Sequence, residues 1–243
     1  MTSTQPGSAL TSALPGEIAK FNRLAAEWWD PSGPMAPLHA MNPLRTGWVD
    51  RHLPERGRLL DVGCGAGLAA EAFARMGHQV TGIDAAGDAV AAAAAHAEGA
   101  GLSVAYRVAT AEALLAEGTR FPAITALEVI EHVADPTRFL ALLAGLLEPG
   151  GSVFVSTLNR TLRSLAIGKI GAEYIARLLP AGTHDWRRFI TPAELDRAAR
   201  PAGLRLVATS GMSYDLRERA WRGSADLSVN YLAMLKLANV VER

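Results

Sequence analysis

The chain has 243 residues, 49% of them hydrophobic and 20% charged, which suits one α/β domain with a buried core and excludes a disordered chain. Its 24 basic side chains balance 24 acidic ones, so we expect no nucleic-acid partner. The single cysteine, Cys64, excludes an internal disulfide, and no apolar run approaches the ~20 residues that span a bilayer. We therefore expect an enzyme or a small-molecule binder of the cytoplasm.

The first predicted elements are a flexible tail over residues 1–16 and helices within residues 17–54, at the start of a single domain that runs to residue 243. From residue 58 onward, short apolar runs alternate with longer segments rich in alanine and leucine. The short runs predict strands over residues 58–62, 79–84, 104–108, 124–128, 152–157, 204–209 and 229–235. The longer segments predict helices over residues 67–76, 87–98, 111–117 and 136–147. This alternation is typical of βαβ units, hence of a mostly parallel sheet with helices on both faces.

The first of these strands runs directly into a glycine-rich turn at Gly63, Gly65 and Gly67. Glycine permits positive φ there and lets backbone N–H groups approach a ligand closely. Asp84 ends the next predicted strand, where a carboxylate can accept hydrogen bonds from both hydroxyls of a ribose. Leu68 replaces the last glycine of the dinucleotide fingerprint, which disfavours NAD and FAD. A tight turn beside an exposed aspartate is the alternative interpretation.

Residues 61–67 (DVGCGAG) resemble the first motif of the class I S-adenosylmethionine-dependent methyltransferases. Residues 17–21 (EIAKF), 28–30 (WWD) and 156–160 (STLNR), with further blocks up to Tyr231, are similar to the ubiquinone-biosynthesis O-methyltransferases. The resemblance implies a Rossmann-like sheet of seven strands in which only the last strand is antiparallel. It also implies S-adenosyl-L-methionine as the methyl donor.

Carried over position by position, the resemblance implies cofactor contacts at Arg45, Asp61, Gly63, Gly65, Asp84, Ala111, Glu112 and Leu127. Arg45 would pair with the carboxylate of the cofactor. Without the resemblance it would be read as a surface arginine on a helix. Leu127 replaces a methionine of related enzymes, and because the two side chains are nearly isosteric a packing contact with adenine would persist.

Two carboxylates and an imidazole follow the fourth predicted strand, at Glu128, Glu131 and His132. If the chain turns there, the three side chains can converge at the sheet edge where open α/β folds bind ligands. Two carboxylates and one imidazole nitrogen would suit Mg²⁺ or a similar divalent ion. A phenol with a pKa near ~10 is about a thousandth ionised at pH 7, which costs its anion roughly 4 kcal/mol, and a metal lowers that cost. Because the resemblance also implies a dependence on divalent ions, we expect all three residues to be catalytic and to bind a divalent cation. A general base without metal, and a structural role in shaping the pocket, remain open.

After the fifth predicted strand comes an insertion over residues 160–190, expected to cover the active site, before a capping box at Thr191 and Glu194 starts the next helix. Residues 162–179 carry an apolar stripe at helical spacing, formed by Ile167, Ile170, Tyr174, Ile175 and Leu178. Between residues 160 and 205, nine basic side chains outnumber four acidic ones. An ordinary packed helix is one interpretation. A substrate with its polyprenyl tail in the bilayer favours peripheral docking on the inner face of the cytoplasmic membrane.

The activity that the resemblance implies is O-methylation of polyprenylated catechols in ubiquinone biosynthesis, at both O-methylation steps, on 2-polyprenyl-6-hydroxyphenol and on 3-demethylubiquinol. Expected partners are these substrates, the membrane surface and other proteins of the pathway. One alternative is methylation of another small phenol or of a carbon or nitrogen nucleophile. Another is a nucleoside-binding scaffold without catalysis. His184 and Asp185 are candidates for the substrate pocket without an assigned role.

Overall fold

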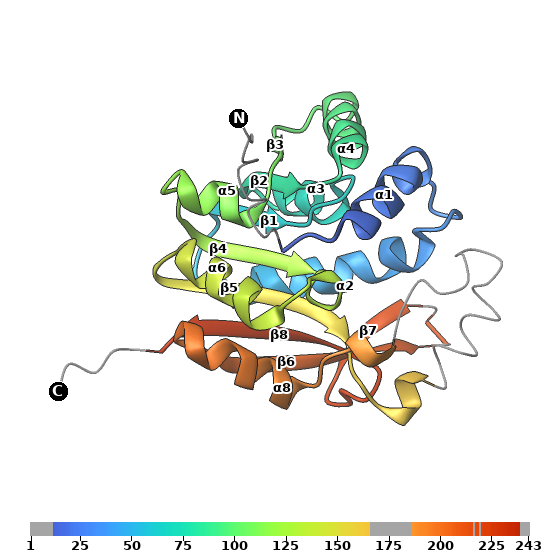
Figure 1. Cartoon of the computed structure of the whole chain (residues 1–243). Helices are drawn as coiled ribbons and strands as arrows, with labels where there is room; N and C mark the ends of the chain where they lie inside the picture. Colours follow the sequence, from blue (N-terminus) through green and yellow to red (C-terminus); the bar gives the residue numbers. More distant parts are fainter. Residues whose placement is uncertain (1–11, 166–185, 216, 219, 239–243) are drawn as a thin grey trace, which may run out of the picture.

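The computed structural model describes residues 12–165, 186–215, 217–218 and 220–238. In this part of the chain eight strands form one sheet in the order β3-β2-β1-β4-β5-β8-β6-β7 (Figure 1). The strands are β1 (Arg58–Val62), β2 (Gln79–Asp84), β3 (Ala105–Val108), β4 (Phe121–Leu127), β5 (Leu147–Leu158), β6 (Leu204–Asp215), β7 (Ala220–Ser224) and β8 (Asn230–Leu237). The first five strands are parallel, and β8 lies antiparallel between β5 and β6.

The predicted Rossmann-like methyltransferase fold is confirmed, with one difference in the sheet. The described strands number eight instead of seven, because β6 continues past residue 209 and turns back as β7, a second antiparallel strand. None of the β7 residues is fully buried. Its sequence therefore lacks the apolar pattern from which strands are predicted.

Seven helices lie wholly within the described residues: α1 (Pro15–Leu24), α2 (Ala36–His52), α3 (Leu68–Arg75), α4 (Gly87–Gly99), α5 (Ala111–Ala116), α6 (Pro136–Gly145) and α8 (Pro192–Ala199). Four short 3₁₀ turns join them: η1 (Ala25–Glu27), η2 (Ile130–His132), η3 (Trp186–Arg188) and η4 (Arg200–Ala202). Helix α1 begins inside the predicted tail, and α2 passes through Pro43. The predicted capping box is present, since Glu194 N–H donates to Thr191 Oγ1 at 3.2 Å and Thr191 N–H to Glu194 Oε2 at 2.9 Å.

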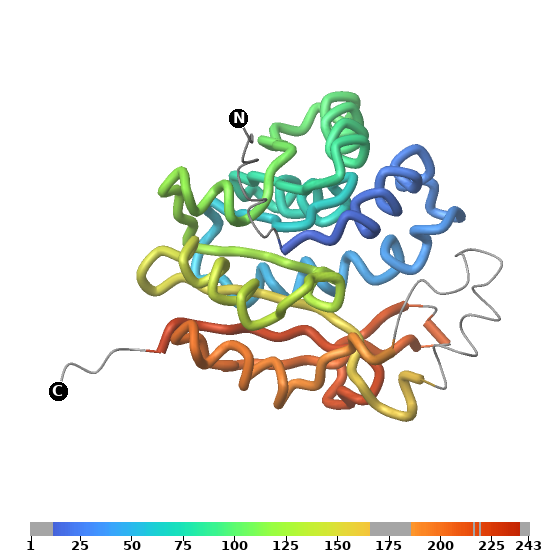
Figure 2. The backbone as a smooth tube through the Cα atoms, in the orientation of Figure 1, coloured from blue at the N-terminus to red at the C-terminus, as the bar shows by residue number. Residues whose placement is uncertain are grey.

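Successive side chains of β1 point to opposite faces of the sheet, so each face has its own core layer. Leu59 packs with Trp48 of α2 and Phe73 of α3. Leu60 packs on the other face with Leu143 of α6 and Leu195 of α8. In Figure 2 the blue trace of α1 lies beside α4, which it contacts, above the carboxyl ends of the parallel strands.

The insertion is only partly within the described residues, because residues 166–185 lie outside them. The predicted apolar stripe, His184 and Asp185 therefore cannot be compared with the structure. At the near end of the insertion, Leu162 is 79% exposed. No helix of the described part of the chain is long and apolar enough to cross a membrane.

Candidate active site

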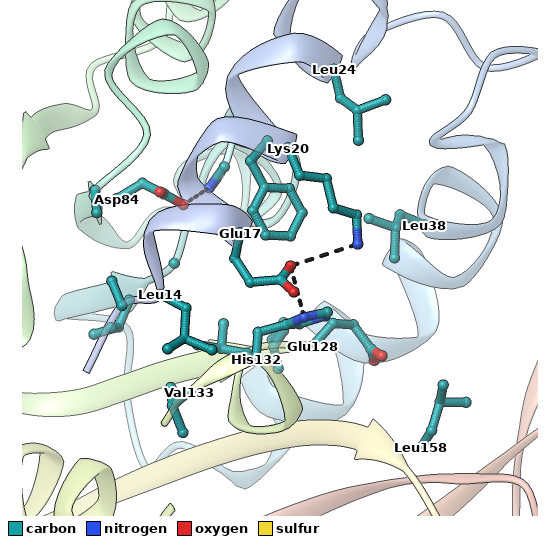
Figure 3. Close-up of a pocket in the computed structure, with 18 of the residues that line it drawn as sticks. Leu14, Glu17, Lys20, Leu24, Leu38, Asp84, Glu128, His132, Val133 and Leu158 are labelled. Atoms are coloured by element: carbon teal, nitrogen blue, oxygen red, sulfur yellow. Dashed lines mark hydrogen bonds and ion pairs between the residues drawn. The ribbon is translucent and has the colours of Figure 1, made fainter. Parts of the chain in front are cut away.

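A cavity of about 660 Å³ opens at the carboxyl ends of the parallel strands, under α1 (Figure 3). This volume is within the range of small-molecule sites. Its wall is mostly apolar, and the charged or titratable side chains on it are those of Glu17, Lys20, Asp84, Glu128 and His132. The glycine turn, the end of β2, the start of α5 and the end of β4 form one side of the cavity, and α1 forms another.

The glycine turn can be built only from glycine. Gly63, Gly65 and Gly67 have φ values of 71°, 53° and 90°. A Cβ on Gly65 would lie 2.3 Å from the ring of Trp28, and a Cβ on Gly63 would lie 2.6 Å from Val129. The turn is also fixed to β2, because the N–H group of Gly63 donates to the Ile83 carbonyl at 2.8 Å. Both the backbone conformation and the space around it therefore require glycine.

Asp84 stands at the end of β2 and lines the cavity. Its Oδ2 accepts a hydrogen bond from Gly65 N–H at 2.9 Å, and its Oδ1 accepts one from Ala86 N–H at 2.8 Å. Burial raises the pKa of Asp84, and these two backbone bonds oppose the shift. A carboxylate has about four acceptor positions, so both oxygens can still accept from a ligand such as the two hydroxyls of a ribose.

The other predicted cofactor residues fall into two groups. Ala111 and Leu127 line the cavity beside Gly63 and Gly65. Glu112 does not line it, because its Oε1 accepts a hydrogen bond from Ser12 N–H at 2.7 Å. The structure thus places Glu112 against the N-terminal segment.

Arg45 and Asp61 lie behind the cavity wall. Arg45 is only 3% exposed, and Nη1 lies 3.7 Å from Glu128 Oε1 while Nη2 donates to Asn42 Oδ1 at 3.4 Å. Burial lowers the pKa of Arg45, and the carboxylates of Glu128 and Asp61 oppose this. Asp61 accepts a hydrogen bond from Thr125 Oγ1 at 2.7 Å, and burial raises the pKa of Asp61 to about 6. In this structure Arg45 faces Glu128 and not the cavity.

Glu128 follows β4 with a φ of 58° and is the only non-glycine residue with positive φ in the described part of the chain. Its N–H group donates to the Ser156 carbonyl at 3.0 Å and lies 3.1 Å from Ser156 Oγ. The Ser156 hydroxyl donates to Glu128 Oε1 at 2.6 Å. Such a conformation costs on the order of 1–3 kcal/mol and persists only where neighbouring groups enforce it. Here Ser156 and Arg45 enforce it, and Glu128 lines the cavity.

Glu131 is held on the opposite face of β5. Side chains alternate along a strand, so Ser156 and Thr157 point to opposite faces, and Thr157 Oγ1 donates to Glu131 Oε2 at 3.0 Å. Glu131 is 4% exposed and does not line the cavity. Burial raises the pKa of Glu131 well above its usual range, and the charge of Glu128 raises it further.

His132 points in a third direction, toward α1. Its Nδ1 lies 3.1 Å from Glu17 Oε2, and its ring meets Phe21 edge to face at a centroid distance of 5.8 Å. The expected convergence of Glu128, Glu131 and His132 on one metal ion was therefore wrong for this arrangement, because strand alternation and the turn η2 direct the three side chains apart. No three His, Cys, Asp or Glu side chains of the described residues are grouped so as to hold a metal ion.

Comparison with known proteins agrees with a fold and a cavity that suit a nucleoside cofactor. Residues 38–209 match the model of a methyltransferase domain. Ubiquinone biosynthesis O-methyltransferases from Azorhizobium caulinodans and Cereibacter sphaeroides are 46% and 48% identical to the chain, over 92% and 90% of it and 94% of each relative. The relative from Caulobacter vibrioides is 45% identical over 96% of the chain and 98% of its own length. The chain belongs to the ubiquinone biosynthesis O-methyltransferase family.

Solved structures support the fold of this O-methyltransferase. The magnesium protoporphyrin IX methyltransferase of Synechocystis matches with a TM-score of 0.60 and 18% identity, over 89% of this chain and 93% of that one. A protein of Pyrococcus horikoshii matches with a TM-score of 0.64 and 16% identity, over 90% and 98% of the two chains. At these identities the likeness concerns the fold alone.

The methyl donor of this O-methyltransferase is S-adenosyl-L-methionine, and the site fits it. Gly63 and Gly65 of the glycine turn line the cavity, and Asp84 presents its carboxylate beside this turn. The same cavity continues under α1 to the apolar side chains Leu38, Leu158 and Trp186. A cofactor and an acceptor can therefore occupy one continuous space.

Three polar residues of this methyltransferase site had no predicted role. Glu17 and Lys20 reach the cavity from α1, and Ser156 fixes Glu128 from β5. Glu17 and Lys20 stand one helical turn apart within the block EIAKF, so their common direction was readable from the sequence. Nothing in the sequence indicated that Ser156 meets Glu128.

Proposed function

We propose that the chain carries out both O-methylation steps of ubiquinone biosynthesis, on 2-polyprenyl-6-hydroxyphenol and on 3-demethylubiquinol. S-adenosylmethionine-dependent O-methylation in this pathway is the activity of its family. The observation that carries the finer proposal is one cavity that joins a nucleoside-type site at Asp84 to a large apolar region. That region suits an aromatic ring with an apolar tail and is lined by Leu38, Leu158, Trp186, Phe189, Trp221 and Val229.

The proposed reaction begins with removal of the phenol proton. We assign proton acceptance to Nε2 of His132, whose other ring nitrogen, Nδ1, lies 3.1 Å from Glu17 Oε2. The cofactor, when bound, supplies an electrophilic methyl group on a sulfonium. The apolar wall excludes water from the reacting atoms. Alignment of phenolate and methyl group can contribute on the order of 7–11 kcal/mol to lowering the barrier.

The cofactor contacts proposed for this chain are those of Gly63, Gly65, Asp84, Ala111 and Leu127. They are supported by the position of these residues on the cavity wall. Arg45 and Asp61 would act indirectly, Arg45 by holding Glu128 and Asp61 by accepting a hydrogen bond from Thr125. A direct contact with the cofactor would require Arg45 to leave Glu128. Glu112 would have to release Ser12 before it could reach a ligand.

The divalent cation that the resemblance implies stays a prediction. The described side chains do not form the predicted three-ligand site, and no step proposed here passes through a metal. The measurement is activity after chelation, with and without added Mg²⁺. Reversible loss would support the ion, whereas full activity of a demonstrably metal-free enzyme would remove it and leave O-methylation intact.

We also propose that the insertion covers the active site and docks on the membrane surface. Ser164 and Leu165 before residues 166–185, and Trp186 and Phe189 after them, all line the cavity, which supports the first part. The exposed side chain of Leu162 supports the second. Liposome flotation tests it, since a triple change of Ile167, Ile170 and Leu178 to Asp should weaken binding. Equal binding by the variant and the wild type would refute it.

The decisive experiment for the function is a methyl-transfer assay with a short-chain polyprenyl catechol and a demethylubiquinol analogue. Methylated oxygen in both products is expected. Methylation of one substrate alone would restrict the proposal to one step. Cofactor binding without turnover on either would instead favour a nucleoside-binding scaffold.

A further inference from the structure

Lys20 brings a positive charge to the cavity that holds the proposed reaction. It extends from α1 with Nζ 3.6 Å from Glu17 Oε2 and 5.5 Å from the ring centre of Phe21, and its side chain is 21% exposed. Figure 3 shows the Glu17 carboxylate between Lys20 and His132, joined to each by a dashed line. Of the described residues that line the cavity, Lys20 is the only lysine or arginine.

The composition of the chain makes this lysine unusual. Only three of the 24 basic residues are lysines, namely Lys20, Lys169 and Lys236, and the rest are arginines. A lysine ammonium is a compact point charge with three donors, whereas a guanidinium is a planar fork suited to two-pronged contacts. A single phenolate oxygen in a confined cavity is matched by the compact charge.

The remaining charges around the cavity are unfavourable to an anionic substrate. The groups that face it are Glu17 of α1, Asp84 at the end of β2, Glu128 after β4 and His132 of η2. Three of these four are carboxylic acids. In an apolar surrounding a phenolate beside carboxylates is strongly disfavoured unless a cation lies close to it.

We propose that Lys20 is a catalytic residue that binds the phenolate oxygen and stabilises its negative charge during methyl transfer. The inference rests on the proposed function. The phenol O–H bond breaks, its proton passes to His132 Nε2, and the oxygen keeps the electron pair. This pair forms the new C–O bond while the C–S bond of the donor breaks and its electrons stay on sulfur. Lys20 keeps its proton throughout.

A purely structural role for Lys20 predicts a different behaviour. A partly exposed ion pair between residues three apart on a helix contributes little to stability. Loss of that pair would affect all acceptors alike. Loss of phenolate stabilisation instead lowers the methylation rate most for the acceptors whose phenol pKa is highest.

The test compares Lys20→Met, Lys20→Arg and the matched control Lys236→Met at a fixed Mg²⁺ concentration. Lys20→Met should lower kcat about 100-fold for an ordinary polyprenyl catechol at pH 7, as the removal of one preorganised charge partner does elsewhere. The loss should shrink for a nitro-substituted catechol and with rising pH. Lys20→Arg should recover part of the rate, and Lys236→Met should match the wild type. Calorimetry should find S-adenosylhomocysteine binding unchanged in all three.

A second measurement does not depend on turnover. The absorbance of bound 4-nitrocatechol reports its ionisation, and the wild type should ionise it at lower pH than Lys20→Met does. An equal ionisation midpoint in both proteins, or an equal loss of kcat for acidic and ordinary catechols, would overturn the inference. A wild type that lowers the midpoint but methylates no catechol would overturn the proposed function and leave the charge role of Lys20 standing.

Discussion

Ser156 on β5 and Glu128, directly after β4, are joined through both backbone and side chain. The Ser156 hydroxyl donates to Glu128 Oε1 at 2.6 Å, and the Ser156 carbonyl accepts the Glu128 N–H at 3.0 Å. Ser156 is fully buried, and Glu128 holds a left-handed conformation that few side chains adopt. One short side chain thus fixes both the backbone and the carboxylate of a residue on the cavity wall.

Ser156→Ala is expected to destabilise the protein and slow the reaction. Removing the hydroxyl leaves a partly buried carboxylate with one partner fewer, which costs about 1–3 kcal/mol. Denaturant unfolding measures this loss, and kcat is expected to fall by about tenfold as Glu128 becomes less well positioned. Ser152→Ala is the matched control, because Ser152 is buried on the same strand but pairs with Ala123 of β4, four residues away from the end of β4. Equal effects of the two changes would contradict the role given to Ser156.

Gly65→Ala is expected to impair cofactor binding more than stability alone explains. The new Cβ would lie 2.3 Å from the Trp28 ring at a φ of 53°. Gly101→Ala is the control, because Gly101 has a φ of 65° and nothing within 4 Å of a Cβ, so it introduces only the backbone strain of roughly 1–2 kcal/mol. Calorimetry with S-adenosylhomocysteine should show weaker binding for Gly65→Ala and unchanged binding for Gly101→Ala.

Asp84→Asn is expected to raise the Kd for S-adenosylhomocysteine by about 10- to 100-fold, since charge-assisted hydrogen bonds are among the stronger contacts. The amide has one acceptor oxygen, so it cannot serve both Gly65 N–H and Ala86 N–H as the carboxylate does. Asp88→Asn, in the first turn of α4, makes the same change at an exposed position. Similar Kd values for both variants would show that Asp84 does not bind the cofactor.

Raising the pH from about 4 to 7 is expected to destabilise the fold through Asp61. Burial raises the pKa of Asp61 from 3.8 to about 6, so the folded state favours the neutral acid and its contribution is lost as pH rises through 6. The shift corresponds to about 3 kcal/mol of unfolding free energy at neutral pH. Asp61→Asn cannot ionise, so its unfolding free energy should fall less between pH 4 and pH 7. If the unfolding free energy of Asp61→Asn falls as much between pH 4 and pH 7 as that of the wild type, Asp61 is not the group responsible.

The regular part of the fold could be read from periodicity alone. The bounds of β1 and β2 agree with the prediction, because a short apolar run between polar turns has few other interpretations. The start of α8 agrees because its capping box is local. Helix α2 lies within the predicted helical region of residues 17–54, but nothing local shows that it continues through Pro43, where it packs against α3.

The site was predictable to the extent that its parts are contiguous. The glycine turn and Asp84 follow directly from strand ends, and both line one cavity. Glu128, Glu131 and His132 are also contiguous, yet each finds its partner on a different element, at Ser156, Thr157 and Glu17. Proximity in sequence therefore did not become proximity of side chains.

The sequence by itself determined the alternation of strands and helices from β1 to β5, the glycine turn and the family, because these depend on local periodicity and on contiguous motifs. Only the tertiary structure decided that Arg45 pairs with Glu128 and that Lys20 and His132 face one cavity. It also decided how the neutral overall charge is distributed around the cavity, where one lysine meets three carboxylic acids. The physical reason is that these contacts join residues far apart in the chain, and their direction follows from which face of a strand or helix each side chain leaves.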